Sequence, residues 1–449
     1  MPSNAPRLDP GCMTASQQLE GHSSVTRRTS TDMDKRSKSF PLIPRNSRLA
    51  FQQEMPGWTR TETLEQSYMI LDKSRSCGLS FGKSMDDIFE KLQDDTSSLW
   101  QSPAESVKRL KQVPSAATFF KEYVATSTPV IIAGGASAWK ATSSWDLDSL
   151  ARENPELEVT VDWTPNGRGD CVVEDDEPDC PVFVKSEERK MRFKSFVDAL
   201  HAQGAQSRSD GRLTGGDVCS EDDGVLYLSH QNDNLRHEFP GLVADIEPFL
   251  EVAREAFGNE PDAVNLWIGD DRSTSAVHKD HYENMYCVVR GEKHFTLLPP
   301  SDVLFLYEQD YPQGRYRRTA DATRFDIKRE PGTVSWIPVD PEKPDLDLYP
   351  LFRYASPVQC TLGPGDILYL PALWYHQVSQ RGVTIAVNYW HDMQFDFKYV
   401  YYRFMQQLAK KRTFTLTGRR KALSLALKAS PQNDDLEEEK RIRVLNGRA

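Results

Sequence analysis

Three side chains of types that bind metal ions occur in the second half of the chain. His278 and Asp280 are two positions apart, and on an extended strand alternate side chains point to the same face, so both would point into one cavity. His376, shortly after the apolar stretch 365–371, could supply a third ligand. Two histidines and one carboxylate leave part of a metal's coordination sphere open, as in non-haem Fe(II) oxygenases, whereas a structural zinc site is closed by four ligands.

A fourth side chain, Lys293, could bind a co-substrate. A His-x-Asp triplet alone also occurs on ordinary surface strands, so the residues around it decide its meaning. Lys293 follows a predicted turn at 290–292 and opens a predicted strand with Phe295 and Leu297. Its ordinary interpretation is an exposed hairpin lysine. If it points into an apolar barrel, its ammonium needs an anionic partner, because an unpaired buried charge is costly. A dicarboxylate co-substrate would supply that partner.

Short strands separated by glycine and proline turns must position these residues. Such a pattern favours a sandwich or jelly roll, so we expect a mainly β fold with flanking helices. The predicted strands are 224–229, 263–268, 283–289, 293–298, 365–371 and 383–390. A helix is predicted over 395–408, with Phe397, Tyr401, Phe404, Met405 and Leu408 on one face. That face would either cover the barrel or meet a second copy of the chain in a homodimer.

Composition divides the chain into three parts. Residues 1–83 form a predicted, mostly disordered tail, because serine- and threonine-rich segments with few apolar residues cannot offset their ordering entropy. Folded structure is expected over 84–408, where a helix over 116–124 and a strand over 128–133 precede the strand-rich half. Residues 204–223 are predicted to form a loop. A polar extension is expected over 409–449.

Charge and cysteine content limit the partners. The formal net charge of −11 opposes a nucleic acid as the main partner, since phosphate binding needs clustered positive charge. Seven widely spaced cysteines, with no Cys-x-x-Cys pair, indicate a reducing compartment. No stretch is long and apolar enough for a membrane helix. We therefore expect a cytoplasmic protein, with the nucleus as a second location.

Long sequence runs identify a family. The chain resembles JmjC-domain 2-oxoglutarate oxygenases from about residue 84 to 408, and within them the small (3S)-lysyl hydroxylase subfamily. The runs that carry this resemblance are 261–269, 278–295, 299–302, 334–346, 365–378, 385–393 and 396–399. Such runs are far more specific than a bare His-x-Asp triplet. The resemblance implies a double-stranded β-helix, the cupin-like jelly roll.

The resemblance also implies a role for each site residue. His278, Asp280 and His376 match the ligands of Fe(II), which binds 2-oxoglutarate and dioxygen. Lys293 matches the residue that pairs with the distal carboxylate of 2-oxoglutarate. Hydroxyls and amides lining the same cavity are implied at Tyr227, Ser275, Asn284 and Asn388. The two asparagines could equally be hydrogen-bonded scaffold.

Three functions stay open on the sequence. The subfamily implies hydroxylation of a protein substrate, a lysine of a developmentally regulated GTP-binding protein. A second interpretation is a histone-lysine demethylase or an endopeptidase, although the chain has no His-Glu-x-x-His motif. The third is a cupin-like binding module without catalysis. It predicts a damaged ligand set, and the three ligands and Lys293 are all present.

Overall fold

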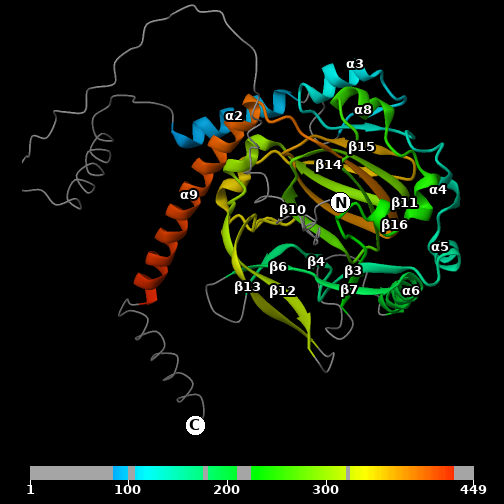
Figure 1. Ribbon diagram of the computed structural model, residues 1–449. Coiled ribbons are helices and arrows are strands. Elements are labelled where there is room, and N and C mark those ends of the chain that lie inside the picture. Colours follow the sequence, from blue (N-terminus) through cyan, green and yellow to red (C-terminus); the bar gives the residue numbers. More distant parts are fainter. Residues whose placement is uncertain (1–83, 100–106, 175–180, 210–223, 320–323, 429–449) are drawn as a thin grey trace, which may run out of the picture. The chain divides into compact units, whose positions relative to one another are not determined.

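The computed structural model describes residues 84–99, 107–174, 181–209, 224–319 and 324–428, with only the helical backbone over 203–209 and 413–428 (Figure 1). The predicted tail 1–83 lies outside these residues, as does 429–449 of the predicted extension. The chain divides into two units, residues 20–89 and a unit that contains residues 90–449. The sheets and the site described below belong to the second unit.

Nine strands form the central sheet of the described part. Their order is β1-β2-β15-β11-β16-β10-β4, with β14 paired to β11 and β9 paired to β16. Their bounds are Arg109–Leu110 (β1), Val130–Ile132 (β2), Arg168–Gly169 (β4), Ala263–Gly269 (β9), Thr274–Lys279 (β10), Tyr282–Leu298 (β11), Val358–Leu362 (β14), Ile367–Leu370 (β15) and Tyr375–Asp392 (β16). Valine, isoleucine and aromatic residues recur in β2, β9, β15 and β16, as expected for buried sheet positions.

The register of the sheet brings distant residues together. β16 lies between β11 and β10, and on the β10 side His278 is directly opposite His376. On the β11 side the antiparallel pairing runs from Tyr282 opposite Asp392 to Leu298 opposite Tyr375. One strand, β16, therefore connects the histidine pair with the strand that carries Lys293.

The structure corrects the predicted turn at 290–292. Predicted strands 283–289 and 293–298 are parts of the single strand β11, whose register with β16 shifts on both sides of Arg290. Gly291 has a φ of +75°, and a Cβ there would lie 2.4 Å from the carbonyl oxygen of Val383. The glycine signal therefore marks a β-bulge with a close backbone approach, not a chain reversal.

Two smaller sheets complete the β structure of the described part. One has the order β13-β12-β6-β5 and the other β7-β3-β8. Their bounds are Glu158–Thr164 (β3), Cys171–Val173 (β5), Val182–Lys185 (β6), Glu187–Arg192 (β7), Val225–Tyr227 (β8), Gln309–Arg318 (β12) and Phe325–Trp336 (β13). A bridge between Leu228 and Ile268 connects the end of β8 to β9 of the central sheet.

Buried aromatic rings connect two of the helices to the central sheet. Phe119 contacts Phe257 at 6.0 Å and Tyr369 at 5.0 Å between ring centroids. The helices are Met85–Leu99 (α2), Ala116–Phe119 (α3), Phe120–Val124 (η2), Lys140–Ser144 (α4), Leu147–Glu153 (α5), Phe193–Ser209 (α6), Asn234–His237 (α7), Pro240–Asp245 (η3), Glu251–Phe257 (α8), Pro300–Leu304 (η4), Pro350–Tyr354 (η5) and Phe397–Lys428 (α9). The predicted mainly β fold with flanking helices is confirmed.

Three predictions about helices are tested by these bounds. The predicted helical segment 116–124 is formed by α3 and η2. The predicted loop 204–223 was wrong for its first residues, since α6 continues to Ser209. None of the described helices is long and apolar enough to cross a membrane.

The C-terminal helix α9 differs from its prediction in length and in its buried face. It continues to Lys428 and does not end at 408, because the lysine, arginine, alanine and leucine residues that follow are good helix formers. Tyr402, Gln406 and Ala409 are buried. The predicted apolar face is turned outward, with Phe397, Tyr401, Phe404 and Leu408 exposed. It does not cover the barrel, and the homodimer stays a prediction.

Candidate active site

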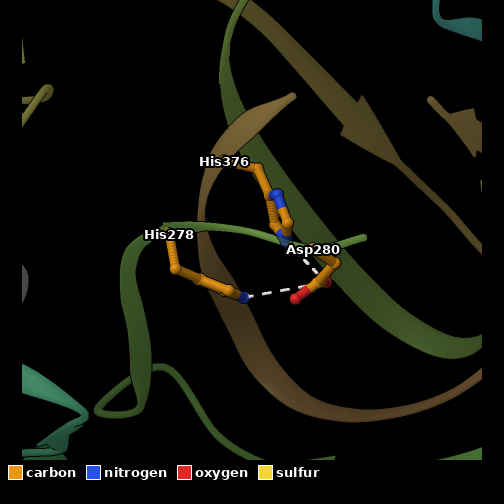
Figure 2. A group of neighbouring side chains, drawn as sticks. All are labelled: His278, Asp280 and His376. Atoms are coloured by element: carbon orange, nitrogen blue, oxygen red, sulfur yellow. Dashed lines mark ion pairs between the residues drawn. The ribbon is translucent and has the colours of Figure 1, made fainter. Parts of the chain in front are cut away.

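His278, Asp280 and His376 converge at the end of β10 and the start of β16 (Figure 2). The Oδ2 atom of Asp280 lies 4.0 Å from Nε2 of His278 and 3.6 Å from Nε2 of His376. One ligand atom from each residue lies within 4.8 Å of the others. The antiparallel register places the histidines opposite each other, and the two-residue spacing brings in the carboxylate. The group could hold a metal ion.

Both imidazoles are oriented by their own strands. Nδ1 of His278 lies 2.7 Å from the carbonyl oxygen of Ala276, and Nδ1 of His376 lies 3.0 Å from that of Trp374. A proton on each Nδ1 donates to the carbonyl and leaves the Nε2 lone pair facing Asp280. Burial, and then the neighbouring His278, lower the pKa of His376 to about 4. The ring is therefore neutral near pH 7, which is the form that binds metal.

This donor set fits Fe(II). Two imidazole nitrogens and one carboxylate oxygen match the facial arrangement of non-haem iron oxygenases. Within the described ranges, no other histidine, cysteine or acidic side chain joins the group, so the four-ligand closure of a structural zinc site is not formed. His281 is turned away and contacts the rings of Phe395 and Tyr399.

Lys293 points into the interior and not to solvent. Its side chain is buried, and its Nζ donates to the hydroxyl of Tyr227 at 3.1 Å and to Oε1 of Gln380. Among the described residues no carboxylate forms an ion pair with it, and burial lowers its pKa to about 7. The alternative of an exposed hairpin lysine is therefore wrong, because strand alternation from the bulge at Gly291 directs Lys293 inward with Phe295.

The surroundings of Lys293 suit the binding of an anion. Ser275 lines the same cavity as Tyr227. The buried Nε2 of Gln380 has no acceptor among the described residues. Gly269 makes room, since a Cβ there would lie 2.6 Å from the Tyr227 ring and 2.7 Å from that Nε2 atom. An ammonium, a hydroxyl and an orphaned amide donor together suit the distal carboxylate of 2-oxoglutarate.

A cavity of about 90 Å³ adjoins both groups. It is lined by Tyr227, Ser275, His278 and Trp336. The Trp336 ring is stacked on the His278 ring, with 6.2 Å between the ring centroids. Three carboxylates also line it: Asp162, Asp170 and Glu188. Lys185 and Arg315 line it as well, so the cavity combines one predicted metal ligand, the hydroxyl partner of Lys293 and a wall with charges of both signs.

The two predicted asparagines lie behind the cavity wall. The indole Nε1 of Trp267 donates to Oδ1 of Asn388 at 2.9 Å, and Nδ2 of Asn388 donates to Oδ1 of Asn284 at 3.2 Å. Trp267 itself lines the cavity, whereas neither amide does. This arrangement favours the scaffold interpretation, in which the amides orient the indole.

Sequence reasoning missed Gln380, Trp336 and Asp170. Gln380 had a signal, because His376, Val378 and Gln380 alternate on one face of β16. Trp336 ends β13 and Asp170 follows β4. No local pattern connects these two with the site, since their approach depends on the packing of separate sheets.

The described geometry agrees with comparisons to known proteins. Residues 116–397 match the family model of the cupin-like domain. The bifunctional peptidase and (3S)-lysyl hydroxylase JMJD7 of Homo sapiens is 38% identical over 307 residues, which cover 68% of this chain and 90% of that protein. The chain belongs to the cupin-like JmjC family.

Two further JmjC relatives match a similar share of the chain. JmjC domain-containing protein E of Dictyostelium discoideum is 36% identical over 348 residues, covering 72% of this chain and 94% of that protein. The lysine-specific demethylase JMJ32 of Arabidopsis thaliana is 38% identical over 339 residues, covering 71% of this chain and 93% of that protein. The predicted JmjC membership and cupin-like jelly roll are confirmed. The protein is a 2-oxoglutarate-dependent oxygenase, as predicted, and not a binding module alone.

Proposed function

We propose that this JmjC oxygenase hydroxylates a lysine side chain of a protein substrate. This proposal depends mainly on one observation: a possible three-ligand metal group and a buried lysine without an ion-pair partner among the described residues reach one cavity through His278 and through Tyr227, and carboxylates line that cavity. With Fe(II), 2-oxoglutarate and dioxygen bound, such a site supplies an oxidant that inserts one oxygen atom into a C–H bond, with succinate and carbon dioxide as the other products. A relative is named as a (3S)-lysyl hydroxylase, which agrees with this assignment.

The chain's own residues divide the work in this proposal. His278, Asp280 and His376 would hold Fe(II) and leave one side of it open. Lys293, with Tyr227 and the amide of Gln380, would hold the distal carboxylate of 2-oxoglutarate. Because this pocket is buried, the attraction between ammonium and carboxylate is strong and water is excluded. The residues thereby fix which end of the co-substrate faces the metal.

One carboxylate of the cavity wall supports a cationic substrate side chain. Glu188 is paired with Arg315 at 2.7 Å, and Asp162 accepts a hydrogen bond from Ser229. Asp170 makes no hydrogen bond or ion pair with any described residue. Burial raises its pKa, although the nearby His278, Lys185 and Arg315 act in the opposite direction. A lysine ammonium entering the cavity would give this carboxylate a partner. Asp170 is therefore the group that we assign to the substrate ammonium.

The identity of the protein substrate is a further part of the proposal. We propose a developmentally regulated GTP-binding protein, on the basis of the subfamily resemblance, and a cytoplasmic location with the nucleus as a second one. Demethylation is the second candidate function, because a relative of equal identity is named as a lysine-specific demethylase. The two reactions differ in which carbon lies near the metal. A chain carbon keeps its hydroxyl, whereas an oxidised N-methyl carbon leaves as formaldehyde.

One experiment separates these outcomes. The purified protein is incubated with Fe(II), ascorbate, 2-oxoglutarate and the candidate GTP-binding protein, beside a matched reaction on methylated histone peptides. We expect a lysine-containing peptide that is heavier by one oxygen atom, detected by mass spectrometry, and no formaldehyde. Formaldehyde release from the histone peptides without any oxidised lysine would replace the hydroxylase by a demethylase. New peptide termini would indicate a peptidase.

A further inference from the structure

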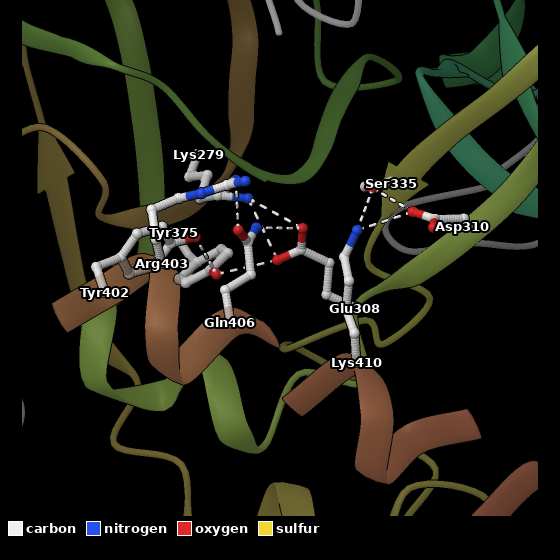
Figure 3. Close-up of polar contacts among 9 residues, drawn as sticks. All are labelled: Lys279, Glu308, Asp310, Ser335, Tyr375, Tyr402, Arg403, Gln406 and Lys410. Carbon is white, nitrogen blue, oxygen red and sulfur yellow. Dashed lines mark hydrogen bonds and ion pairs between the residues drawn. The ribbon is translucent and has the colours of Figure 1, made fainter. Parts of the chain in front are cut away.

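A buried lysine lies between two of the predicted metal ligands. Lys279 separates His278 from Asp280 in the chain, and strand alternation turns it to the opposite side. Its Nζ lies 3.3 and 3.4 Å from the two carboxylate oxygens of Glu308 (Figure 3). The side chains of Lys279 and Glu308 are 8% and 1% exposed, so both charges are removed from water.

Two residues of α9 complete this ion pair. Nε2 of Gln406 donates to Oε1 of Glu308 at 2.7 Å. The hydroxyl of Tyr375 donates to Oε2 of Glu308 at 3.3 Å and lies 2.8 Å from the hydroxyl of Tyr402. Tyr375 precedes the ligand His376. The network therefore reaches the chain neighbours of all three ligands, and two of its members come from α9.

The helix is held in place on both sides of this network. Arg403 donates to Oε1 of Gln406 at 2.7 Å, which directs the Nε2 group of Gln406 at Glu308. One turn later, Lys410 pairs with Asp310 at 2.8 Å and donates to Ser335. The amide of Gln406 thus has a set orientation on a helix that is anchored to β12 and β13.

We infer that Tyr402 and Gln406 of α9 are positioning residues of the metal centre. A buried ion pair is stable only when the remaining hydrogen-bonding capacity of both charges is satisfied, and removal of one partner leaves an uncompensated charge. Relief of that charge requires Lys279 or Glu308 to move. Because Lys279 is covalently flanked by His278 and Asp280, its movement displaces two ligands together.

This inference rests on the proposed function, since it assumes that the three residues bind metal. It assigns α9 a role beyond covering the sheet. In this role, side chains of α9 that touch neither metal nor co-substrate influence metal affinity and ligand geometry. Loss of a hydrogen-bond partner of a metal ligand typically weakens metal binding by about 10–100-fold, and here the partners act through one intervening residue.

Adjacent residues on α9 supply matched controls. Gln406→Leu is compared with Gln407→Leu, and Tyr402→Phe with Tyr401→Phe, because Gln407 and Tyr401 are exposed on the same turns. The full chain is titrated anaerobically with Co²⁺, whose visible spectrum reports ligand geometry. We expect about tenfold weaker binding and an altered spectrum for Gln406→Leu. A smaller effect of the same kind is expected for Tyr402→Phe, with both controls unchanged.

Thermal unfolding of the metal-free proteins separates positioning from folding. Tyr402→Phe removes one hydroxyl and keeps the packed ring, so it tests the inference even if Gln406→Leu is unstable. Wild-type Co²⁺ affinity and spectrum in both Tyr402→Phe and folded Gln406→Leu would overturn the inference and leave the proposed function intact. Failure of the wild-type chain to bind Co²⁺ would instead overturn the metal centre, and the inference with it.

Discussion

Two lysines near the metal group are both buried, yet their surroundings differ. Lys279 faces Glu308, a carboxylate of the same chain. Lys293 meets only the neutral oxygens of Tyr227 and Gln380 among the described residues. Burial lowers the pKa of Lys293 to about 7. It also acts to lower the pKa of Lys279, but Tyr402 and Glu308 outweigh it and the pKa is raised.

The difference separates a structural cation from a binding cation. A buried charge with a resident partner stabilises the arrangement of the elements that carry the two charges. A buried charge without one destabilises the fold, and is compensated when a diffusible anion binds. On this basis Lys279 belongs to the support of the ligands and Lys293 to the co-substrate pocket. Four predictions test this division.

The largest effect is expected from the ligands that lie between the two lysines. Replacing His278, Asp280 or His376 by alanine removes one of three bonds from an already open site. We expect loss of bound iron and of 2-oxoglutarate turnover. The loss should exceed the about 10–100-fold typical when only a hydrogen-bond partner of a ligand is removed. Iron content and succinate formation are measured. If a variant keeps both iron content and succinate formation at wild-type levels, the replaced residue is not a metal ligand.

The second prediction exchanges the two lysines for the same residue. Lys279→Met leaves Glu308 buried and unpaired, so it should lower the free energy of unfolding by about 3–5 kcal/mol. Lys293→Met should weaken 2-oxoglutarate binding by about 2–5 kcal/mol and keep iron bound. Denaturant unfolding and co-substrate titration of both variants provide the comparison. If the two variants lower the free energy of unfolding equally, the division between a structural lysine and a co-substrate-binding lysine is wrong.

Sequence reasoning reached the parts of the site that are local in the chain. The two-residue spacing of His278 and Asp280 predicts a shared face, and the apolar alternation after Lys293 allowed an inward lysine. His376 was predicted as a ligand from its position after a strand and from the family resemblance. Glu308 and Gln406 had no such signal, because Glu308 approaches Lys279, and Gln406 of α9 approaches Glu308, only in the packed fold. Polar residues of this kind look like surface positions in a sequence.

The same limit applies to the fold. Apolar runs and glycines predicted the mainly β class and the strands β2, β8, β9, β11, β15 and β16, but most strands of the two smaller sheets were not predicted. Gly291 was interpreted as a turn, since a left-handed glycine serves a turn and a bulge equally well. The end of α9 was placed too early because a change from apolar to basic residues was interpreted as the end of a helix. Long helices can continue past the residues that they bury.

The third prediction concerns pH and Lys293. Its pKa falls from 10.5 to about 7 on folding, so between these pH values the unfolded chain binds one more proton than the folded chain. The cost of burying Lys293 therefore decreases as pH rises. Binding of 2-oxoglutarate needs the ammonium, so its affinity should fall as pH rises above about 7, by up to about tenfold per pH unit. Calorimetric titrations across this range should show proton uptake. A pH-independent affinity would contradict the pairing.

The smallest effect is expected at Asp170 in the cavity wall, where the same comparison concerns a carboxylate instead of an ammonium. Among the described residues Asp170 has no ion-pair partner, as Lys293 has none, so a substrate lysine should compensate its charge. Asp170→Asn removes a hydrogen bond between charged groups, typically worth about 1.5–3 kcal/mol. We expect a higher KM for a lysine substrate, with 2-oxoglutarate affinity unchanged. Asp271→Asn, at an exposed position between β9 and β10, is the control. If both variants raise KM equally, the recognition of the ammonium lies elsewhere, because a general loss of negative charge would explain the result.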